Sequence, residues 1–350
     1  MMDKDIIPHS RPLITDADLE AVASALKSGQ LSQGAEVEKF ERTLAEFIGK
    51  KRGAATSSGT AALHLALLAL DIKEKDEVII PSFVCSAVLN AVNYTGANPV
   101  IVDIEPLTYN ISVDAVKRAI SPKTKAIIVP HMFGCPAEMD ELSGLDIPII
   151  EDCAQAVGAT FKSQIAGSFG LLFVFSFYAT KVLACGEGGM VLSNSEDLIS
   201  KIKDLRQYDN KDDYILRYNY KMTDIQATLG LSQLSSLEKF IAKRKEIATR
   251  YFEEFKNCDF SLPVWKKGKE HIYYRFVIKT KDDASVYLKK FHQKGIMCQR
   301  SVYKPLHLYL KQAGFPNSSE AWQKAFSIPL YPSLKDKEIE KIINVVKEIF

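Results

Sequence analysis

The sequence predicts an α/β protein: a large first domain with a mostly parallel sheet, then a smaller C-terminal α+β domain. Short apolar runs alternate with helical patterns through the first part of the chain. Continuous Val/Ile runs are typical of strands that are buried on both faces. After a long helical stretch, the pattern changes to a strand, a helix, turn-rich segments and a terminal helix. A chain of 350 residues is long enough for two domains.

The elements of the first domain follow from the spacing of its apolar residues. Two amphipathic helices open the chain, and Gly49 is a plausible end of the second. The apolar faces carry Leu19, Val22, Ala23 and Leu26 in the first helix, and Val37, Phe40, Leu44, Phe47 and Ile48 in the second. The predicted strands are 78–81, 99–103, 126–130, 148–152, 171–177 and 189–192. Ligands of open α/β sheets bind beyond the carboxyl ends of such strands.

A helical pattern from residue 223 to about 255, with a basic stretch at 243–245, predicts the connection to the second domain. A strand at 273–278, a helix around 284–293 and a terminal helix at 335–350 follow. We therefore expect a large domain with an N-terminal helical segment over 1–240 and a small domain over 241–350.

The composition excludes several classes of protein. Charged residues make up 25%, and the net charge is only +2 with both signs interspersed, so nucleic acid or an anionic membrane is not an expected partner. The six cysteines form no CxxC pair, so we expect reduced thiols and no metal site. The first residues lack the apolar region of a signal peptide. We expect a soluble cytoplasmic protein.

The most informative segment is FSFYATKVLACGEGGM at 175–190, in which Lys181 follows an aromatic strand and precedes a glycine cluster. A lysine in such a place is suited to form a Schiff base with an aldehyde cofactor, because desolvation lowers the lysine pKa. Glycines allow close approach of the backbone. The alternative is a surface lysine in a strand-to-helix loop.

A second candidate is Asp152, at the predicted end of a very apolar strand in PIIEDCAQAVGA. The cofactor pyridoxal 5'-phosphate (PLP) needs a carboxylate against its ring nitrogen, because the protonated ring draws in electrons. Gln155 could reach the same ligand. Glu151 competes, but adjacent strand residues face opposite ways, so only one of the two can point at the site. The alternative role of Asp152 is to cap a following helix.

The start of the helical run SSGTAALHLALLAL predicts a phosphate site at Ser58, Gly59 and Thr60, since free N–H groups and the helix dipole attract anions. Ser176 could add a hydroxyl. A plain Ser cap is the alternative. Two further candidates, Asn219 before a helix that Thr223 caps and His307 after a proline, have turn and structural alternatives.

Together these segments resemble the DegT family of nucleotide-sugar aminotransferases, which are fold-type I PLP-dependent enzymes. The resemblance covers nearly the whole chain, and the ordered set of motifs is far more specific than any one of them. The motifs are IPHSRPLIT, LSQGAEVEKFE, SSGTAALHLAL, DEVIIPSF, GANPVIVDIEPLTYNI, TKAIIVPHMFGCPAEMD, IIEDCAQAVGA, FSFYATK, GEGGM, YNYKMTDIQA, PLH and SIPLYPSL.

The resemblance implies a fold-type I transferase with a mostly parallel seven-stranded sheet, and a role for each matching residue. Lys181 would carry the cofactor, Asp152 would pair with the pyridinium nitrogen, and Gln155 would contact the ring hydroxyl side. Asn219 would reach the phosphate of a neighbouring subunit, which implies a homodimer with shared active sites. The other implied contacts are Ser58, Gly59, Thr60, Ser176 and Cys85 for the cofactor, and His307, Tyr303 and Glu187 for the substrate.

The chain departs from the family pattern at three positions. Cys85 stands where relatives often place an aromatic over the PLP ring, Lys221 where they often have arginine, and Val302 where they often have histidine. Some relatives replace the Schiff-base lysine by histidine and deoxygenate sugars; Lys181 is present here, which disfavours that branch.

The expected reaction is amino transfer from L-glutamate to a nucleotide-linked keto-sugar, in amino-sugar synthesis for a surface polysaccharide or related glycan. The same chemistry on a keto-cyclitol is an alternative that the sequence does not separate. Two other classes are a PLP-dependent sugar dehydratase or eliminase and a non-catalytic PLP-binding or sugar-sensing protein. The presence of both Lys181 and Asp152 disfavours the last.

Overall fold

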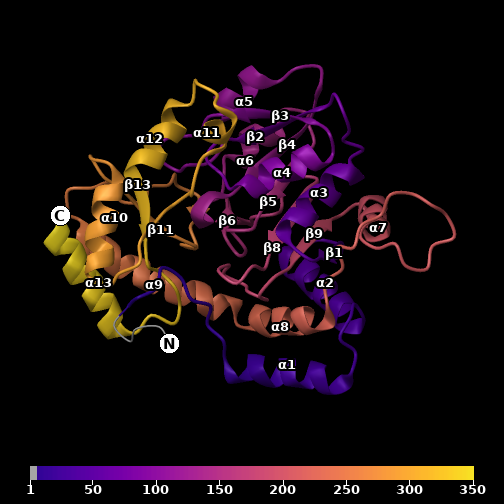
Figure 1. Ribbon diagram of the computed structural model, residues 1–350, viewed down its shortest axis with the longest axis horizontal. Helices are drawn as coiled ribbons and strands as arrows, with labels where there is room; N and C mark the ends of the chain where they lie inside the picture. Colours follow the sequence, from indigo (N-terminus) through magenta and orange to yellow (C-terminus); the bar gives the residue numbers. More distant parts are fainter. Residues whose placement is uncertain (1–5) are drawn as a thin grey trace.

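The computed structural model describes residues 6–350 and shows a large α/β body with a smaller α+β part beside it (Figure 1). The main sheet has seven strands in the order β1–β9–β8–β5–β4–β2–β3. The strands are β1 (Arg52–Thr56), β2 (Glu77–Pro81), β3 (Asn98–Val102), β4 (Thr124–Pro130), β5 (Ile149–Asp152), β8 (Leu172–Ser176) and β9 (Gly189–Ser193). Strands from β8 to β3 pair in parallel, and β9 is antiparallel to both neighbours. The predicted mostly parallel, seven-stranded sheet is confirmed.

Helices cover both faces of this sheet because alternate strand residues point in opposite directions. Leu172 and Val174 pack with α3, α4 and α7, whereas Phe173 and Phe175 pack with α2 and α8. The helices of the large body are α1 (Asp16–Ser28), α2 (Ala35–Ile48), α3 (Gly59–Ala69), α4 (Ser86–Tyr94), α5 (Val113–Ala119), α6 (Met139–Ser143), α7 (Glu196–Leu205) and α8 (Asp224–Ser235). The predicted end of α2 at Gly49 and the predicted cap of α8 by Thr223 are both confirmed.

Helix α1 forms where predicted, but the apolar face of this helix is turned to solvent. Leu19 is 61% exposed and Leu26 is 52% exposed, whereas Ala25 and Asp18 are buried. The Asp18 carboxylate caps its own helix through Thr15 and accepts a hydrogen bond from Gln233 of α8 at 2.8 Å. Polar contacts therefore hold α1 on α8, and the leucines stay uncovered.

The C-terminal part has its own apolar core around a three-stranded sheet in the order β11–β13–β12. Its elements are α9 (Leu237–Phe255), β11 (Phe276–Lys279), α10 (Ala284–Gln293), β12 (Gln299–Arg300), α11 (Leu306–Leu310), α12 (Pro316–Lys324), β13 (Ala325–Ile328) and α13 (Asp336–Ile349). A further small sheet joins β10 (Lys269–Glu270), β6 (Thr160–Phe161) and β7 (Gln164–Ile165). The N-terminal Ile7 packs into the C-terminal core, so the start of the described chain belongs to the same part of the molecule as its end (Figure 1).

Two predicted boundaries in the second half are corrected. The single helical stretch from 223 to 255 is two helices, because the chain breaks at Ser236 between α8 and α9. The strand predicted at 273–278 begins only at Phe276, because Tyr273 adopts a left-handed backbone conformation with φ of 51° and stacks on His271. Helix α9 runs across the expected domain boundary at 240/241, which stays a prediction.

Within residues 6–350, no helix combines the length and apolar character that crossing a membrane requires.

Candidate active site

The predicted cofactor lysine and its carboxylate partner lie close together at the carboxyl ends of β5 and β8. Lys181 follows β8, and its Nζ lies 5.1 Å from the centre of the Tyr274 ring. The charge of Lys181 acts on the Asp152 carboxyl at the end of β5, and both charges act on the thiol of Cys85. Cys85 is exposed and immediately precedes α4. Three residues that are far apart in the sequence thus meet where ligands of α/β sheets bind.

The adjacent acids of β5 point to opposite faces, as strand geometry requires. Asp152 is 8% exposed, and burial raises the pKa of its carboxyl, although the amide of Ala154 donates to Oδ1 at 3.0 Å. No helix follows to be capped, since a turn continues the chain. Glu151 instead is fully buried and faces His131. Asp152 is therefore the acid on the side of Lys181.

Glu151 belongs to a structural network rather than to a metal centre. His131, Glu151 and Cys153 offer ligand atoms within 4.8 Å of one another. However, the Glu151 oxygens already accept hydrogen bonds from His131 Nε2 and from three backbone amides, those of Gly167, Phe169 and Gly170. The other ring nitrogen of His131 accepts from a backbone amide. Burial opposes ionisation of Glu151, but the His131 and backbone hydrogen bonds outweigh it and lower the pKa of the carboxyl.

The start of α3 and the end of β8 lie against each other and form what we call the phosphate cradle, made of Ser58, Gly59, Thr60 and Ser176. The Ser58 hydroxyl caps α3 by accepting from the Ala61 amide at 3.1 Å, which leaves the first-turn amides of Gly59 and Thr60 without helical partners. A β-carbon on Gly59 would lie 2.8 Å from the β-carbon of Ser176. A β-carbon on Gly189 would collide with the Ser58 carbonyl. The glycines therefore let β8, β9 and α3 converge, and they bring Ser58, Gly59 and Ser176 together.

Gln155 and the aromatic side chains around it form another wall of the site. The Gln155 side-chain oxygen accepts from the Phe133 amide at 2.9 Å. The Phe133 ring packs edge-on against Tyr109 and Phe83, the residue two before Cys85. The position of Gln155 is thereby fixed by a backbone contact, and its amide nitrogen stays available to a ligand.

Asn219 points away from its own molecule. Its neighbours Tyr218 and Tyr220 stack on each other and lie edge-on to His64, with ring centres 4.9 and 6.0 Å away. Because alternate residues of an extended segment face opposite ways, Asn219 is exposed between them. The Tyr220 carbonyl accepts from the amide of Ser57, beside the phosphate cradle, at 2.7 Å.

The three predicted substrate residues have different surroundings. Tyr303 is 86% exposed, and Glu187 is also exposed. His307 is buried: Nδ1 lies 2.6 Å from the hydroxyl of Ser82 and Nε2 lies 3.1 Å from that of Ser319. Both ring nitrogens of His307 are thus engaged in a link between the loop after β2 and α12.

Sequence reasoning missed two residues beside Lys181, namely Tyr274 and Arg275. The Tyr274 hydroxyl lies 3.3 Å from the hydroxyl of Thr180, and the Arg275 guanidinium carbon lies 5.6 Å from the centre of the Tyr274 ring. Burial opposes ionisation of the phenol, but the charges of Lys181 and Arg275 prevail and lower the pKa of Tyr274 to about 8. No local pattern could reveal this pair, because it depends on how the small domain packs against the large sheet.

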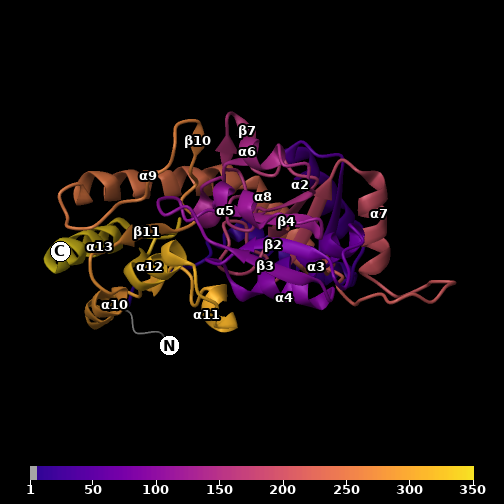
Figure 2. The ribbon, with the colours of Figure 1, turned by 90° about the horizontal axis from the view of Figure 1, so that it is seen from above.

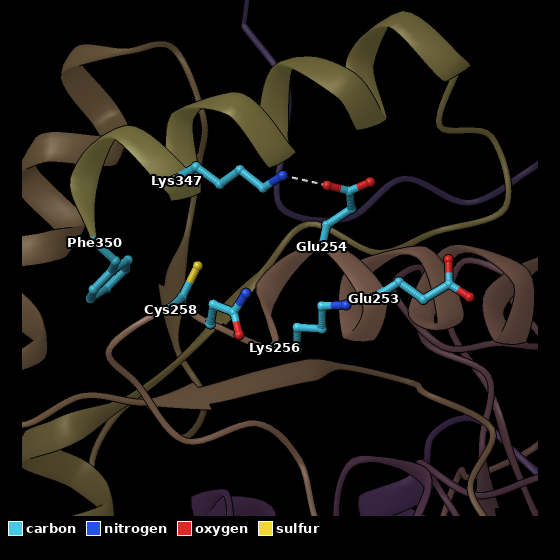
Figure 3. A pocket seen from close by; sticks show the side chains of 7 residues that line it. Glu253, Glu254, Lys256, Cys258, Lys347 and Phe350 are labelled. Carbon is cyan, nitrogen blue, oxygen red and sulfur yellow. Dashed lines mark hydrogen bonds and ion pairs between the residues drawn. The ribbon is translucent and has the colours of Figure 1, made fainter.

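A hollow of about 710 Å³ elsewhere on the molecule is unrelated to these residues. It lies between the C-terminal ends of α9 and α13, and Figure 3 shows the ion pair of Lys347 with Glu254 crossing it. None of the predicted site residues lines it. The predicted site residues therefore lie apart from this hollow, around Lys181.

The comparisons with known proteins identify the family of the chain. The family model described as the DegT/DnrJ/EryC1/StrS aminotransferase family matches residues 12–347. The chain belongs to this family. Relatives include the GDP-perosamine synthase of Escherichia coli O157:H7, 34% identical over 98% of this chain and 98% of the relative. Another is the spore coat polysaccharide biosynthesis protein SpsC of Bacillus subtilis, 34% identical over 98% of this chain and 97% of the relative.

Solved structures add the fold and the cofactor. A putative sugar aminotransferase of Streptococcus pneumoniae in its PMP form (with pyridoxamine phosphate) superposes with a TM-score of 0.93 at 27% identity, over 98% of this chain and 97% of that one. The PLP form superposes with a TM-score of 0.92 at 27% identity, over 99% of this chain and 100% of that one. The DegT-family chain is therefore a PLP-dependent aminotransferase with the fold-type I architecture. A buried acid, an amine and a cradle for phosphate, all in one place, fit PLP.

Proposed function

We propose that this aminotransferase moves an amino group from L-glutamate to a nucleotide-linked keto-sugar, in amino-sugar synthesis for a surface polysaccharide or related glycan. The convergence of Lys181, Asp152 and the Gly59–Ser176 cradle carries the proposal, since each matches a different part of one cofactor. The names of relatives support the substrate class: GDP-perosamine synthases of Escherichia coli O157:H7 and Vibrio cholerae are 34% and 32% identical.

We assign one proposed role to each side chain of the site. Lys181 would hold the aldehyde of PLP, and its Nζ would move a proton between the reacting carbon of the substrate and the cofactor in each half of the reaction. Asp152 holds the proton on the ring nitrogen, and Gln155 contacts the ring hydroxyl side. When bound, PLP supplies an electron sink for the α-carbon.

The remaining proposed contacts hold the phosphate and the ring of the cofactor. The phosphate is held by Ser58, Gly59, Thr60 and Ser176, and Cys85 packs on the ring. We assign the substrate side of the site to Tyr303, Glu187 and His307.

A homodimer with shared active sites is part of the proposal. Asn219 projects from its own chain next to the cradle, which suits a contact with the phosphate in a second copy. The loop that follows α7 projects from the body (Figure 2). This loop carries Tyr214, 95% exposed, and Leu216, 67% exposed. Apolar residues on a projecting loop, together with the uncovered leucines of α1, are typical of an interface. Sedimentation of the purified protein tests the dimer.

The direct test follows the cofactor absorbance of the purified protein. Glutamate should convert the PLP form to pyridoxamine phosphate with release of 2-oxoglutarate, and a nucleotide-linked keto-sugar should reverse the change. Lys181→Ala should lower turnover by about 10²–10⁴-fold or more, because the base is lost. Normal turnover by this variant would refute the assignment. A panel that includes keto-cyclitols separates the main alternative. Loss of water from the sugar without amine transfer would indicate the dehydratase alternative.

We also propose a cytoplasmic location. All six cysteines are free in the structure, and four of them are buried. Free thiols of this number suit a reducing compartment.

A further inference from the structure

His64 is a buried histidine that none of the proposed steps of the reaction uses. It lies in α3, the helix whose first turn forms part of the phosphate cradle, and it is 2% exposed. Burial lowers the pKa of its imidazole to about 4, so the ring is neutral near neutral pH. Its Nε2 is buried and has no hydrogen-bond partner within residues 6–350. Because an unpaired buried nitrogen costs stability, the remaining contacts of the ring have to hold it in place.

Those contacts are made with aromatic rings, and two of the rings belong to the segment that carries Asn219. The His64 ring lies edge-on to Tyr218 and Tyr220, and its Nδ1 lies 3.4 Å from the Tyr220 hydroxyl. The ring of Tyr94 lies edge-on to it as well, with 5.4 Å between the ring centres. Tyr218 and Tyr220 also stack on each other, with ring centres 5.0 Å apart. His64 therefore contacts both neighbours of Asn219, on the side opposite to the Asn219 side chain.

The backbone of this segment is fixed to the large body at both tyrosines. The amides of Tyr218 and Tyr220 donate to two carbonyls at the carboxyl end of α7, at 2.8 and 2.9 Å. The Tyr220 carbonyl accepts from the amide of Ser57, just before the phosphate cradle. These bonds determine the extended path of the chain, and the contacts with His64 determine which face carries the two rings. Together they fix the direction in which Asn219 points.

We propose that His64 positions Asn219 for the phosphate bound by the second copy of the chain, so that each cofactor site depends on the α3 helices of both subunits. The first turn of α3, with Gly59 and Thr60, serves the phosphate of its own chain. His64, further along the same helix, supports the segment that serves the other phosphate. His64 is a positioning residue, because it acts through Asn219. The inference rests on the proposed shared active sites and adds the residue that links them.

The test uses dimers of two differently tagged full-length chains, one with Lys181 and the other with Lys181→Ala. Only the first chain attaches PLP, so the absorbance of the attached cofactor reports the PLP affinity of the one site that receives Asn219 from the second chain. In the second chain, Asn219→Ala should weaken PLP binding by about 10–100-fold and His64→Ala by about 5–50-fold, because a hydrogen bond to a charged phosphate is lost or misplaced. His64→Phe keeps the ring contacts and should stay within about threefold of the wild type.

Moving the substitution to the other chain separates positioning from a merely structural role. In the chain with Lys181, His64→Ala should change the affinity by less than about threefold, because the Asn219 of that chain serves the other site. His292→Ala is the matched control: His292 lies in α10 and contacts the Cys298 carbonyl at 2.9 Å, so this variant should bind PLP like the wild type from either chain.

Three results would overturn the inference. His64→Ala could weaken binding equally from both chains, it could weaken binding from neither, or His64→Phe could bind no better than His64→Ala. If Asn219→Ala in the second chain has no effect, the proposed shared site is wrong and the inference falls with it. If these affinities are as expected but no nucleotide-linked keto-sugar accepts the amine, the inference stands and the proposed acceptor is wrong.

Discussion

Tyr274 should ionise near neutral pH, and this can be measured without any substrate. The phenol is only 7% exposed, and burial alone would raise its pKa. The charges of Lys181 and Arg275, with hydrogen bonds from Thr180 and Arg275, prevail and lower the pKa from 10.0 to about 8. Because the charge of Lys181 lowers the pKa of Tyr274, titration of this phenol reports on the charge of the Lys181 amine.

The size of the effect follows from the shift. Each pKa unit is about 1.4 kcal/mol, so a change from 10.0 to about 8 corresponds to roughly 2.7 kcal/mol in favour of the folded phenolate. Because the pKa in the folded protein is lowered, this stabilisation is fully present above pH 10 and is lost as the pH falls through 8. The stability of the wild type relative to Tyr274→Phe should therefore increase between about pH 8 and pH 10.

The assay is a near-ultraviolet phenolate titration of the cofactor-free protein, taken as the difference between the wild type and Tyr274→Phe. The subtraction isolates one of the 14 tyrosines. Lys181→Met removes the cation and should return the pKa of Tyr274 toward or above 10, since burial then dominates. Lys243→Met, on the exposed side of α9, is the control and should leave the titration unchanged. A wild-type pKa of 10, or a Lys181→Met variant that titrates like the wild type, would refute the reasoning.

Two further predictions concern the neighbouring acids of β5. Asp152→Asn should lower turnover by two to four orders of magnitude, because a buried charge partner is worth about 3–5 kcal/mol. The same variant should keep or raise the melting temperature of the cofactor-free protein, because burial raises the pKa of Asp152 and the ionised carboxyl is costly there. Glu151→Gln should lose about 3–5 kcal/mol of unfolding free energy in a denaturant titration at neutral pH, since it breaks a buried charged network. The pKa of Glu151 is lowered, so its contribution is present above the ordinary carboxyl pKa and the loss should shrink as the pH falls. A stable Glu151→Gln or an active Asp152→Asn would contradict this division.

The sequence predicted the parts of the site that strand ends determine. Lys181, Asp152 and Ser176 follow from buried strands, and parallel strands bring their carboxyl ends to one edge. Strand β1 was missed because RGAAT at 52–56 contains no Val, Ile or aromatic residue and only one β-branched residue, Thr56; its place at the sheet edge depends on pairing with β9. Such pairing between distant segments leaves no local pattern.

The direction of a side chain was harder to predict than its position. The residues around Asn219 in the sequence left a turn as an alternative for it. Its outward orientation is visible only because Tyr218 and Tyr220 both pack on His64. Likewise Arg275 lay within a predicted strand, but the left-handed turn at Tyr273 starts the strand later. The packing of the small domain then decides what Arg275 contacts.

The pair Glu151 and Asp152 shows how one strand serves both the fold and the chemistry. Both acids are buried, yet their pKa values shift in opposite directions, because Glu151 accepts four hydrogen bonds and Asp152 accepts one, from Ala154. A satisfied carboxylate stabilises the fold, whereas an under-satisfied one retains lone pairs for a ligand and reduces stability until the ligand arrives. Bound PLP should therefore raise the melting temperature of the wild type more than that of Asp152→Asn, because only the wild type relieves a buried charge on binding.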